Sequence, residues 1–266
     1  MFPIRHIVTR AHPIASRGGT ARLALACLAG CLSLATSLAS ASAHSYPQTT
    51  NPSANARLDA TPAHVGITYD SNIVQSGTSL VLLDSTDTPV PVQADATSGR
   101  QSSVQPTSDL TPGAYTVAWT SLSADDGHTA QGFYTFVVNG GPIGIVDGQA
   151  QSQAPAADLM TTLTVTSAPD GSSLLRVGLN NTTGVERVRI QLSRPDLGTD
   201  LLDTQPSGDG GWILNGNEVA IPGAWHAQVI VRRTNVVDDA KGDFDFTVDS
   251  VTGAPAFGSA VSPISN

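Results

Sequence analysis

The chain has 266 residues, of which 40% are hydrophobic and 13% are charged, and its formal net charge is −9. This acidity excludes a typical nucleic-acid-binding protein, because phosphates are bound mainly through Lys and Arg. The apolar fraction is too high for a disordered chain. Its 25 Gly and 17 Pro argue against a helical bundle or a coiled coil.

The first 43 residues have the pattern of an export signal. They hold four Arg and no acidic residue, and an apolar run over residues 23–39 leads to Ala41, Ser42 and Ala43. A basic start, an apolar centre and a small-residue cleavage site define a secretory signal peptide. We therefore predict a signal peptide over residues 1–43, although its long basic start also fits a later start codon.

Two alternatives to cleavage after Ala43 remain open at this point. Residues 28–31 (LAGC) are similar to a lipoprotein processing box, which would place a lipid on Cys31. A retained membrane anchor is the other, but the apolar run is short for a span of about 20 residues. Cleavage after Ala43 would remove both Cys of the chain and leave His44 as the first residue.

The chain after Ala43 predicts an all-β protein. Short runs rich in β-branched and aromatic residues alternate with Gly, Pro and Asp-Gly turn signals, as in antiparallel sandwiches and barrels. In the first half, the predicted strands are 65–69, 79–83, 114–119 and 133–138.

A change of composition predicts two domains. Residues 140–157 are rich in Gly, Pro, Ala and Gln, which is typical of a linker. We predict a first domain over 44–139, a second β-sandwich over 158–248 and a flexible tail over 249–266. The strands predicted for the second domain are 161–166, 174–179, 185–192, 212–214, 225–232 and 244–248.

Three residues form a candidate metal site, namely His44, Asp126 and His128. A chain that begins with His offers two nitrogen donors from one residue, the α-amine and ring Nδ1. The α-amine has a pKa of about 7.7–8.0, so a divalent cation can displace its proton near neutral pH. In an extended stretch residues i and i+2 point the same way, so Asp126 and His128 can face one ligand together. A nitrogen and oxygen set without sulfur suits Cu(II).

Four segments of the sequence resemble a known protein family. They are residues 44–58 (HSYPQTTNPSANARL), 62–69 (PAHVGITY), 110–119 (LTPGAYTVAW) and 123–137 (SADDGHTAQGFYTFV). In this order they resemble the CopC-type copper resistance proteins, and the resemblance runs from His44 to about residue 138.

The resemblance implies an Ig-like Greek-key β-barrel or sandwich that binds Cu(II) in the periplasm or cell envelope. His44 would supply its amine and imidazole, Asp126 a carboxylate and His128 an imidazole. Asp125 is the neighbouring carboxylate, but Asp126 has the Asp-Gly-His spacing. The implied partners are the copper ion and a CopD-like inner-membrane copper transporter. Some family members have a Met-rich Cu(I) site, but after Ala43 this chain has only Met160.

The second half carries a weaker resemblance. Residues 210–233 and 244–246 resemble the YtkA/FixH-like β-sandwich, which brings no ligand motif. His64 and His226 are interpreted as surface residues of strands or strand edges, since neither lies in a motif. Trp119, Trp212 and Trp225 are interpreted as core or sheet residues.

The sequence favours a non-enzymatic, exported Cu(II)-binding protein of copper resistance or homeostasis. Two alternatives of other classes stay open. One is a histidine-brace copper oxidase acting on polysaccharide, which also begins with His. The other is a pair of sandwich modules that bind a protein partner without a metal.

Overall fold

The computed structural model describes residues 45–139, 148–167 and 171–258. Within these residues the chain is all-β, with one short 3-10 turn, η1 (Gln75–Gly77), and no α-helix. This confirms the predicted fold class. The predicted signal peptide and His44 lie outside the described residues.

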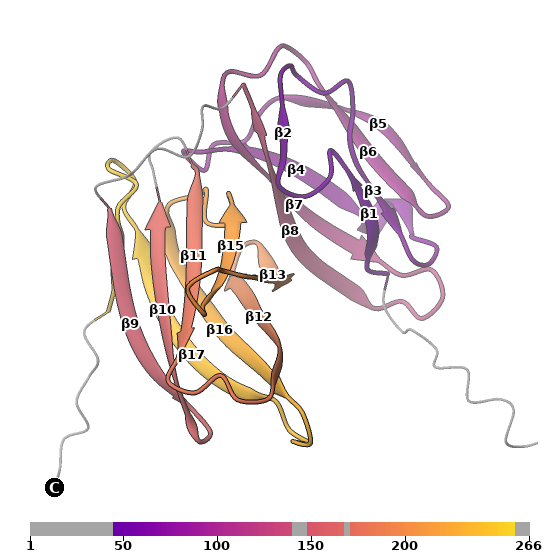
Figure 1. The fold of residues 1–266 in the computed structure, drawn as a ribbon. Coiled ribbons are helices and arrows are strands. Elements are labelled where there is room, and N and C mark those ends of the chain that lie inside the picture. Colours follow the sequence, from indigo (N-terminus) through magenta and orange to yellow (C-terminus); the bar gives the residue numbers. More distant parts are fainter. Residues whose placement is uncertain (1–44, 140–147, 168–170, 259–266) are drawn as a thin grey trace, which may run out of the picture. The chain divides into compact units, whose positions relative to one another are not determined.

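Eight strands build two four-stranded sheets from the first half of the chain. They are β1 (Pro47–Asn51), β2 (Ala56–Leu58), β3 (Val65–Tyr69), β4 (Ser79–Asp84), β5 (Val92–Ser98), β6 (Gln101–Pro106), β7 (Gly113–Leu122) and β8 (Thr129–Val138). One sheet has the order β1-β3-β6-β5 and the other β2-β8-β7-β4 (Figure 1). Neighbouring strands are antiparallel except for β2 and β8, which are parallel.

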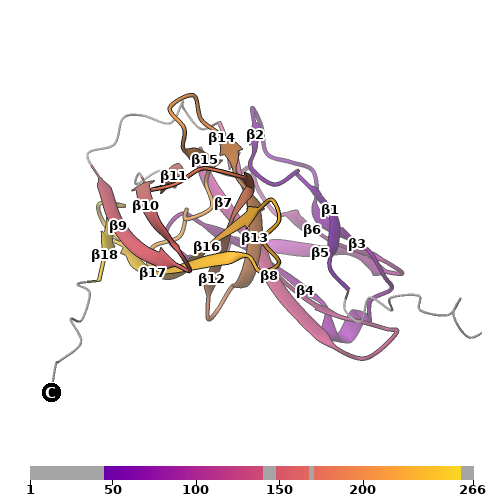
Figure 2. The same cartoon turned by 60° about the horizontal axis from the view of Figure 1, so that its bottom comes forward.

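Ten further strands build two five-stranded antiparallel sheets. They are β9 (Gln149–Ala156), β10 (Leu159–Ser167), β11 (Ser173–Leu179), β12 (Val185–Arg194), β13 (Gly198–Asp203), β14 (Gln205–Pro206), β15 (Trp212–Gly216), β16 (Gly223–Arg233), β17 (Ala240–Val248) and β18 (Pro255–Phe257). The sheet orders are β14-β15-β11-β10-β9 and β13-β12-β16-β17-β18, and Figure 2 shows both in a second view.

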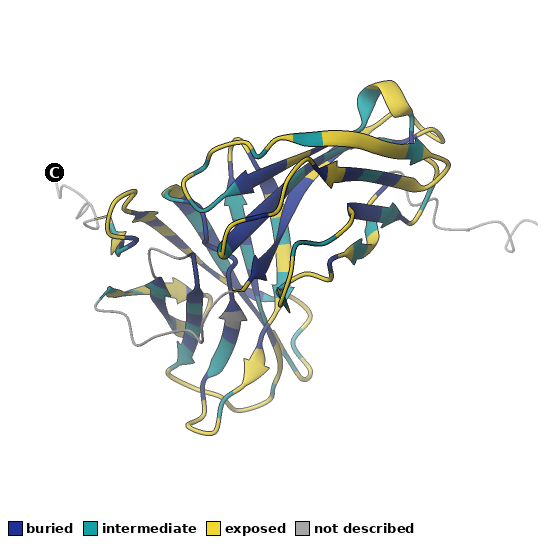
Figure 3. Ribbon diagram, turned by 90° about the horizontal axis from the view of Figure 1, so that it is seen from above, coloured by how far each residue is buried: buried dark blue, intermediate teal, exposed yellow. Residues whose placement is uncertain are grey.

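Side-chain alternation explains why these segments are strands. Along β17 every second residue is buried, so that Phe244, Phe246 and Val248 face the core while the residues between them face solvent. A strand of period two buries one face in this way. Figure 3 shows the result, with buried and exposed residues alternating along many of the strands.

The first pair of sheets buries an aromatic core. Tyr69 on β3 meets Trp119 on β7 edge to face at 6.2 Å between ring centroids, and Tyr115 stacks on Phe136 at 5.6 Å. Trp119 is 7% exposed and Trp225 3% exposed, which confirms both as core residues. This core includes side chains of β7 and β8, and the turn between these strands carries two of the predicted ligands.

The strands that were not predicted from the sequence are mostly edge strands with polar sequences. β5 has the sequence VQADATS, and five of its seven residues are exposed. An edge strand with little buried surface lacks the apolar alternation on which the prediction depends. The strands that were predicted, such as β3 and β10, are the apolar ones.

The predicted linker and tail both contain strands. β9 occupies residues 149–156 of the predicted linker and pairs with β10 along its length. β18 occupies residues 255–257 of the predicted tail and pairs with β17. Small residues explain the discrepancy, because Ala154 and Ala156 reach the core from β9 without forming a hydrophobic run.

By its contacts the chain from Ala43 to Asn266 forms one compact unit, so the boundary between two domains stays a prediction. In the part of the chain that the structure describes, no helix has the length and apolar character that crossing a membrane requires.

Candidate metal centre

The turn between β7 and β8 presents the candidate ligands. β7 ends at Leu122 and β8 begins at Thr129. The Ser123 N–H donates to the His128 carbonyl at 2.9 Å, and the Gly127 N–H donates to the Ser123 carbonyl at 3.1 Å. Gly127 has a φ of +72°, a left-handed conformation that glycine adopts at little cost. The Asp-Gly-His sequence therefore forms a tight turn closed by backbone hydrogen bonds.

Asp126 and His128 meet within this turn. The Asp126 Oδ2 lies 2.9 Å from His128 Nδ1, and Asp126 Oδ1 accepts the His128 N–H at 3.0 Å. Asp126 and His128 are thus in direct contact, while their role as ligands of one metal ion stays a prediction. The His128 side chain is 63% exposed, so a metal ion in solution can reach it.

The electrostatics of the pair favour a charged carboxylate. The hydrogen bond from the His128 ring, with the His128 backbone N–H, lowers the pKa of Asp126 to about 2. Hydrogen bonding to the charged form of an acid has this effect. Asp126 is therefore ionised at every physiological pH, and its oxygens need no deprotonation before they bind a cation.

Ser45, the first described residue, lies against the same part of the fold. Its hydroxyl donates to the carbonyl of Asn72, and that carbonyl also accepts the N–H of Ala124, within the turn. His44 lies outside the described residues. The structure therefore brings together two of the three predicted ligands, and no group of three or more His, Cys, Asp or Glu able to hold a metal occurs among the described residues.

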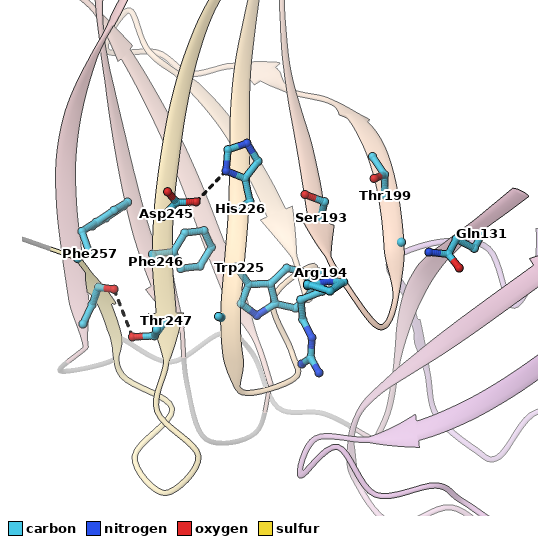
Figure 4. Close-up of a pocket in the computed structure, with 15 residues that line it drawn as sticks. Gln131, Ser193, Arg194, Thr199, Trp225, His226, Asp245, Phe246, Thr247 and Phe257 are labelled. Carbon is cyan, nitrogen blue, oxygen red and sulfur yellow. Dashed lines mark hydrogen bonds and ion pairs between the residues drawn. The ribbon is translucent and has the colours of Figure 1, made fainter. Parts of the chain in front are cut away.

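The other two described histidines lie elsewhere and face solvent, each with a carboxylate. His64 Nδ1 is 3.0 Å from Asp95 Oδ2. His226 on β16 has its Nδ1 2.8 Å from Asp245 Oδ1, because the two residues are register partners across β16 and β17 (Figure 4). The sequence interpretation of both as surface residues agrees with their exposure. Their acidic partners depend on strand register, which no motif reveals.

A pocket of about 680 Å³ lies beside His226, shown in Figure 4. Aromatic side chains of Trp225, Phe246 and Phe257 line it, together with Arg194. Arg194 is held by Asp87 at 2.9 Å and by Asp196, so its charge is already compensated. The pocket includes neither Asp126 nor His128 and is distinct from the candidate metal centre.

Comparisons with known proteins found similarity in the first half of the chain. Among solved structures, CopC from Methylosinus trichosporium OB3b is 29% identical, with 37% of this chain and 97% of that chain covered and a TM-score of 0.33. PcoC, a methionine-rich copper resistance protein from Escherichia coli, is 25% identical, with 36% and 99% covered and a TM-score of 0.32. No curated protein matched the chain.

The family model that matches is the CopC domain, over residues 48–139, a range that includes Asp126 and His128. It does not extend to residues 158–248, where the YtkA/FixH-like resemblance stays a prediction. Residues 48–139 therefore match the CopC domain model, in agreement with the resemblance of the four sequence segments.

Proposed function

We propose that this chain is an exported copper-binding protein of copper resistance or homeostasis, which holds Cu(II) through His44, Asp126 and His128. The observation that carries the proposal is the Asp126–His128 pair, presented on an exposed turn of a CopC domain. The signal-like leader over residues 1–43 supports export to the periplasm or cell envelope.

The donor set fits Cu(II). His128 contributes an imidazole and Asp126 an ionised carboxylate, and His44 would add an amine and a second imidazole. Nitrogen and oxygen donors suit Cu(II), whereas Cu(I) is selected by soft sulfur ligands. Met160, the only Met after residue 43, lies on β10 and far along the chain from this turn.

The residues of the site have different roles in this proposal. Asp126 would be a copper ligand, and without copper its carboxylate contacts His128 Nδ1, which sets the orientation of the ring and places negative charge beside it. A carboxylate that bonds a ligand histidine in this way raises its basicity and fixes its tautomer. The amine of His44 exists only after cleavage at Ala43, so export and processing would complete the site.

The copper acceptor belongs to the same proposal. We infer that a CopD-like inner-membrane transporter takes copper from the exported protein, since the CopC resemblance implies such a partner. The exposed turn supports this inference, because a transporter could approach His128 without unfolding the sandwich.

The decisive experiment compares two proteins that differ by one residue. One begins at His44, as checked by mass spectrometry, and the other carries one extra Gly before His44. We expect one Cu(II) per chain in the first, and in the second a weaker affinity and a changed EPR spectrum, because the extra residue replaces the terminal amine with an amide. Equal affinities and identical spectra would overturn the chelate.

The protein that begins at His44 also tests the alternative of a histidine-brace copper oxidase. We expect no cleavage of chitin or cellulose by the copper-loaded protein with peroxide. Sustained turnover would replace the proposed storage or delivery function with an oxidative one.

A further inference from the structure

We propose that Ser71, Asn72 and Ser121 form, with Ser45, a clamp that fixes the residue after His44 close to the Asp126–His128 turn. The inference rests on the proposed function and adds positioning residues to it. We refer to these four residues as the serine clamp.

The first evidence is the burial of Ser45. Its relative exposure is 0% in the full chain, and after cleavage at Ala43 it would be the second residue. The first residues of a domain are poorly ordered unless other groups hold them. A polar residue that is fully buried at such a place therefore requires hydrogen-bond partners.

Both polar ends of Ser45 have partners. Its hydroxyl lies 2.7 Å from the Ser71 hydroxyl and donates to the Asn72 carbonyl at 3.1 Å. Its carbonyl accepts a hydrogen bond from the Ser121 hydroxyl at 2.7 Å. Ser121 is itself 0% exposed, so this bond is shielded from water. Ser45 is thus held by two separate segments, at its hydroxyl by residues 71 and 72 and at its carbonyl by Ser121.

The next residue is held by the same segment. The Tyr46 N–H donates to Asp70 Oδ1 at 3.0 Å, and the Asp70 N–H donates to the Tyr46 carbonyl at 2.9 Å. The chain therefore enters β1 with two successive residues tied to residues 70–72. A free terminus would not need this number of contacts.

The clamp also touches the turn that carries the ligands. The Asn72 carbonyl accepts both the Ser45 hydroxyl and the Ala124 N–H, the latter at 2.9 Å. Ile73 forms a β-bridge with Ser123, the first residue of the turn. One short segment, residues 70–73, therefore joins the start of the described chain to the Asp126–His128 turn.

This junction matters for a chelate formed by a terminal residue. Consecutive Cα atoms are about 3.8 Å apart, so fixing Ser45 restricts where the residue before it can lie. A ligand held near its bound position loses less conformational freedom when metal binds. The serine clamp would thus raise copper affinity without any of its atoms touching copper.

The test is a set of hydroxyl deletions in protein that begins at His44. Ser121→Ala removes the donor to the Ser45 carbonyl, and Ser71→Ala, at a partly exposed position, removes the contact to the Ser45 hydroxyl. We expect Ser121→Ala to weaken Cu(II) binding by about 10- to 100-fold, the usual effect of groups that orient metal ligands. Ser71→Ala should weaken it less, and Ser121→Thr, which keeps the hydroxyl, should restore it.

A matched control separates positioning from stability. Ser102 is also a buried serine of the same sandwich, and its hydroxyl contacts Thr97 at 3.3 Å on β5. Ser102→Ala should leave the copper affinity and the EPR spectrum unchanged. Hydrogen exchange of the Tyr46 amide without copper gives a second readout, and it should be faster in Ser121→Ala than in the wild type.

The outcomes for the clamp and for the proposed function are distinguishable. If one extra residue before His44 abolishes tight binding while both Ser121→Ala and Ser71→Ala keep wild-type affinity and spectrum, the chelate exists and the clamp is refuted. If the extra residue has no effect, the proposed chelate itself fails in the wild type. A loss of affinity in Ser102→Ala equal to that in Ser121→Ala would also refute the clamp.

Discussion

At the scale of single residues, the candidate centre depends on one hydrogen-bonded pair. Asp126 is charged and hydrogen-bonded to the imidazole of His128, and the His128 side chain is largely exposed. His64 and His226 also have carboxylate partners and similar exposure. What distinguishes His128 is its place in the Asp-Gly-His turn, beside the segment that holds Ser45.

The first prediction concerns His128. His128→Ala should reduce Cu(II) affinity by orders of magnitude, because it removes one of the predicted nitrogen donors and leaves that position to water. Competition titration against a chelator of known affinity measures the change. His64→Ala and His226→Ala are the matched controls and should bind copper as the wild type does. Wild-type affinity in His128→Ala would remove this residue from the site.

At the scale of elements, the packing of β17 on β10 shows how closely the two sheets of the second sandwich approach. Gly242 faces inward between Ala240 and Phe244. A Cβ at Gly242 would lie 2.4 Å from Oγ1 of Thr161 on β10. That hydroxyl donates to the Ala154 carbonyl on β9 at 2.8 Å, so Thr161 cannot rotate away without losing a buried hydrogen bond.

Because of this contact, we expect that replacing Gly242 with Ala destabilises the protein, whereas the same substitution within a strand usually stabilises it. Gly within a strand normally costs about 0.5–1 kcal/mol relative to Ala. Gly242→Ala should instead lower the free energy of unfolding, by about 1–3 kcal/mol, as overpacking of a core does. Urea denaturation measures it, and Lys241→Ala on the exposed side of the same strand should stay within about 0.5 kcal/mol of the wild type. A more stable Gly242→Ala would show that the sheets have room to separate.

At the scale of the whole molecule, this acidic chain buries the carboxyl group of Glu218. Glu218 is 2% exposed, and burial raises its pKa to about 7. Its Oε1 accepts a hydrogen bond from Asn55, while its Oε2 has no hydrogen-bond partner within the described residues. Asp200, whose pKa burial raises to about 6, adds a second acid that resists ionisation.

The pH dependence of stability follows from these raised pKa values. The folded state keeps a proton on Glu218 up to about pH 7, whereas the unfolded state releases it near pH 4.5. The folded state therefore binds more protons in this window, and the free energy of unfolding should fall as pH rises from about 4.5 to 7. Asp200 contributes a fall of the same sign between about pH 4 and 6.

Glu218→Gln tests whether Glu218 causes this fall in stability, because the substitution keeps the shape of the side chain and removes its titration. Urea unfolding of the copper-free protein at several pH values should show a smaller fall above pH 6 in the variant than in the wild type. Val237→Ala, an exposed substitution that removes no titratable group, serves as the control and should retain the wild-type dependence. An identical pH profile in Glu218→Gln would assign the fall to other groups.

The sequence by itself determined the all-β class, most of the apolar strands and the CopC domain. Each depends on local pattern: alternation along a strand, or residues close together in sequence such as Asp126, Gly127 and His128. The Asp126–His128 contact is local in sequence, but it comes from the turn, in which Asp126 accepts the backbone N–H two residues on, and not from the extended stretch on which the prediction was based.

Only the tertiary structure decided which distant residues lie next to the turn that carries that pair. Ser45, Ser71 and Ser121 come from three separate segments, and serines are too common for their spacing to carry a signal. Edge strands β5, β9 and β18 were missed because they bury few large side chains and their strand structure depends on backbone pairing with a neighbour. Contacts between residues far apart in sequence depend on strand register and order, and these are set by the packing of the whole sandwich.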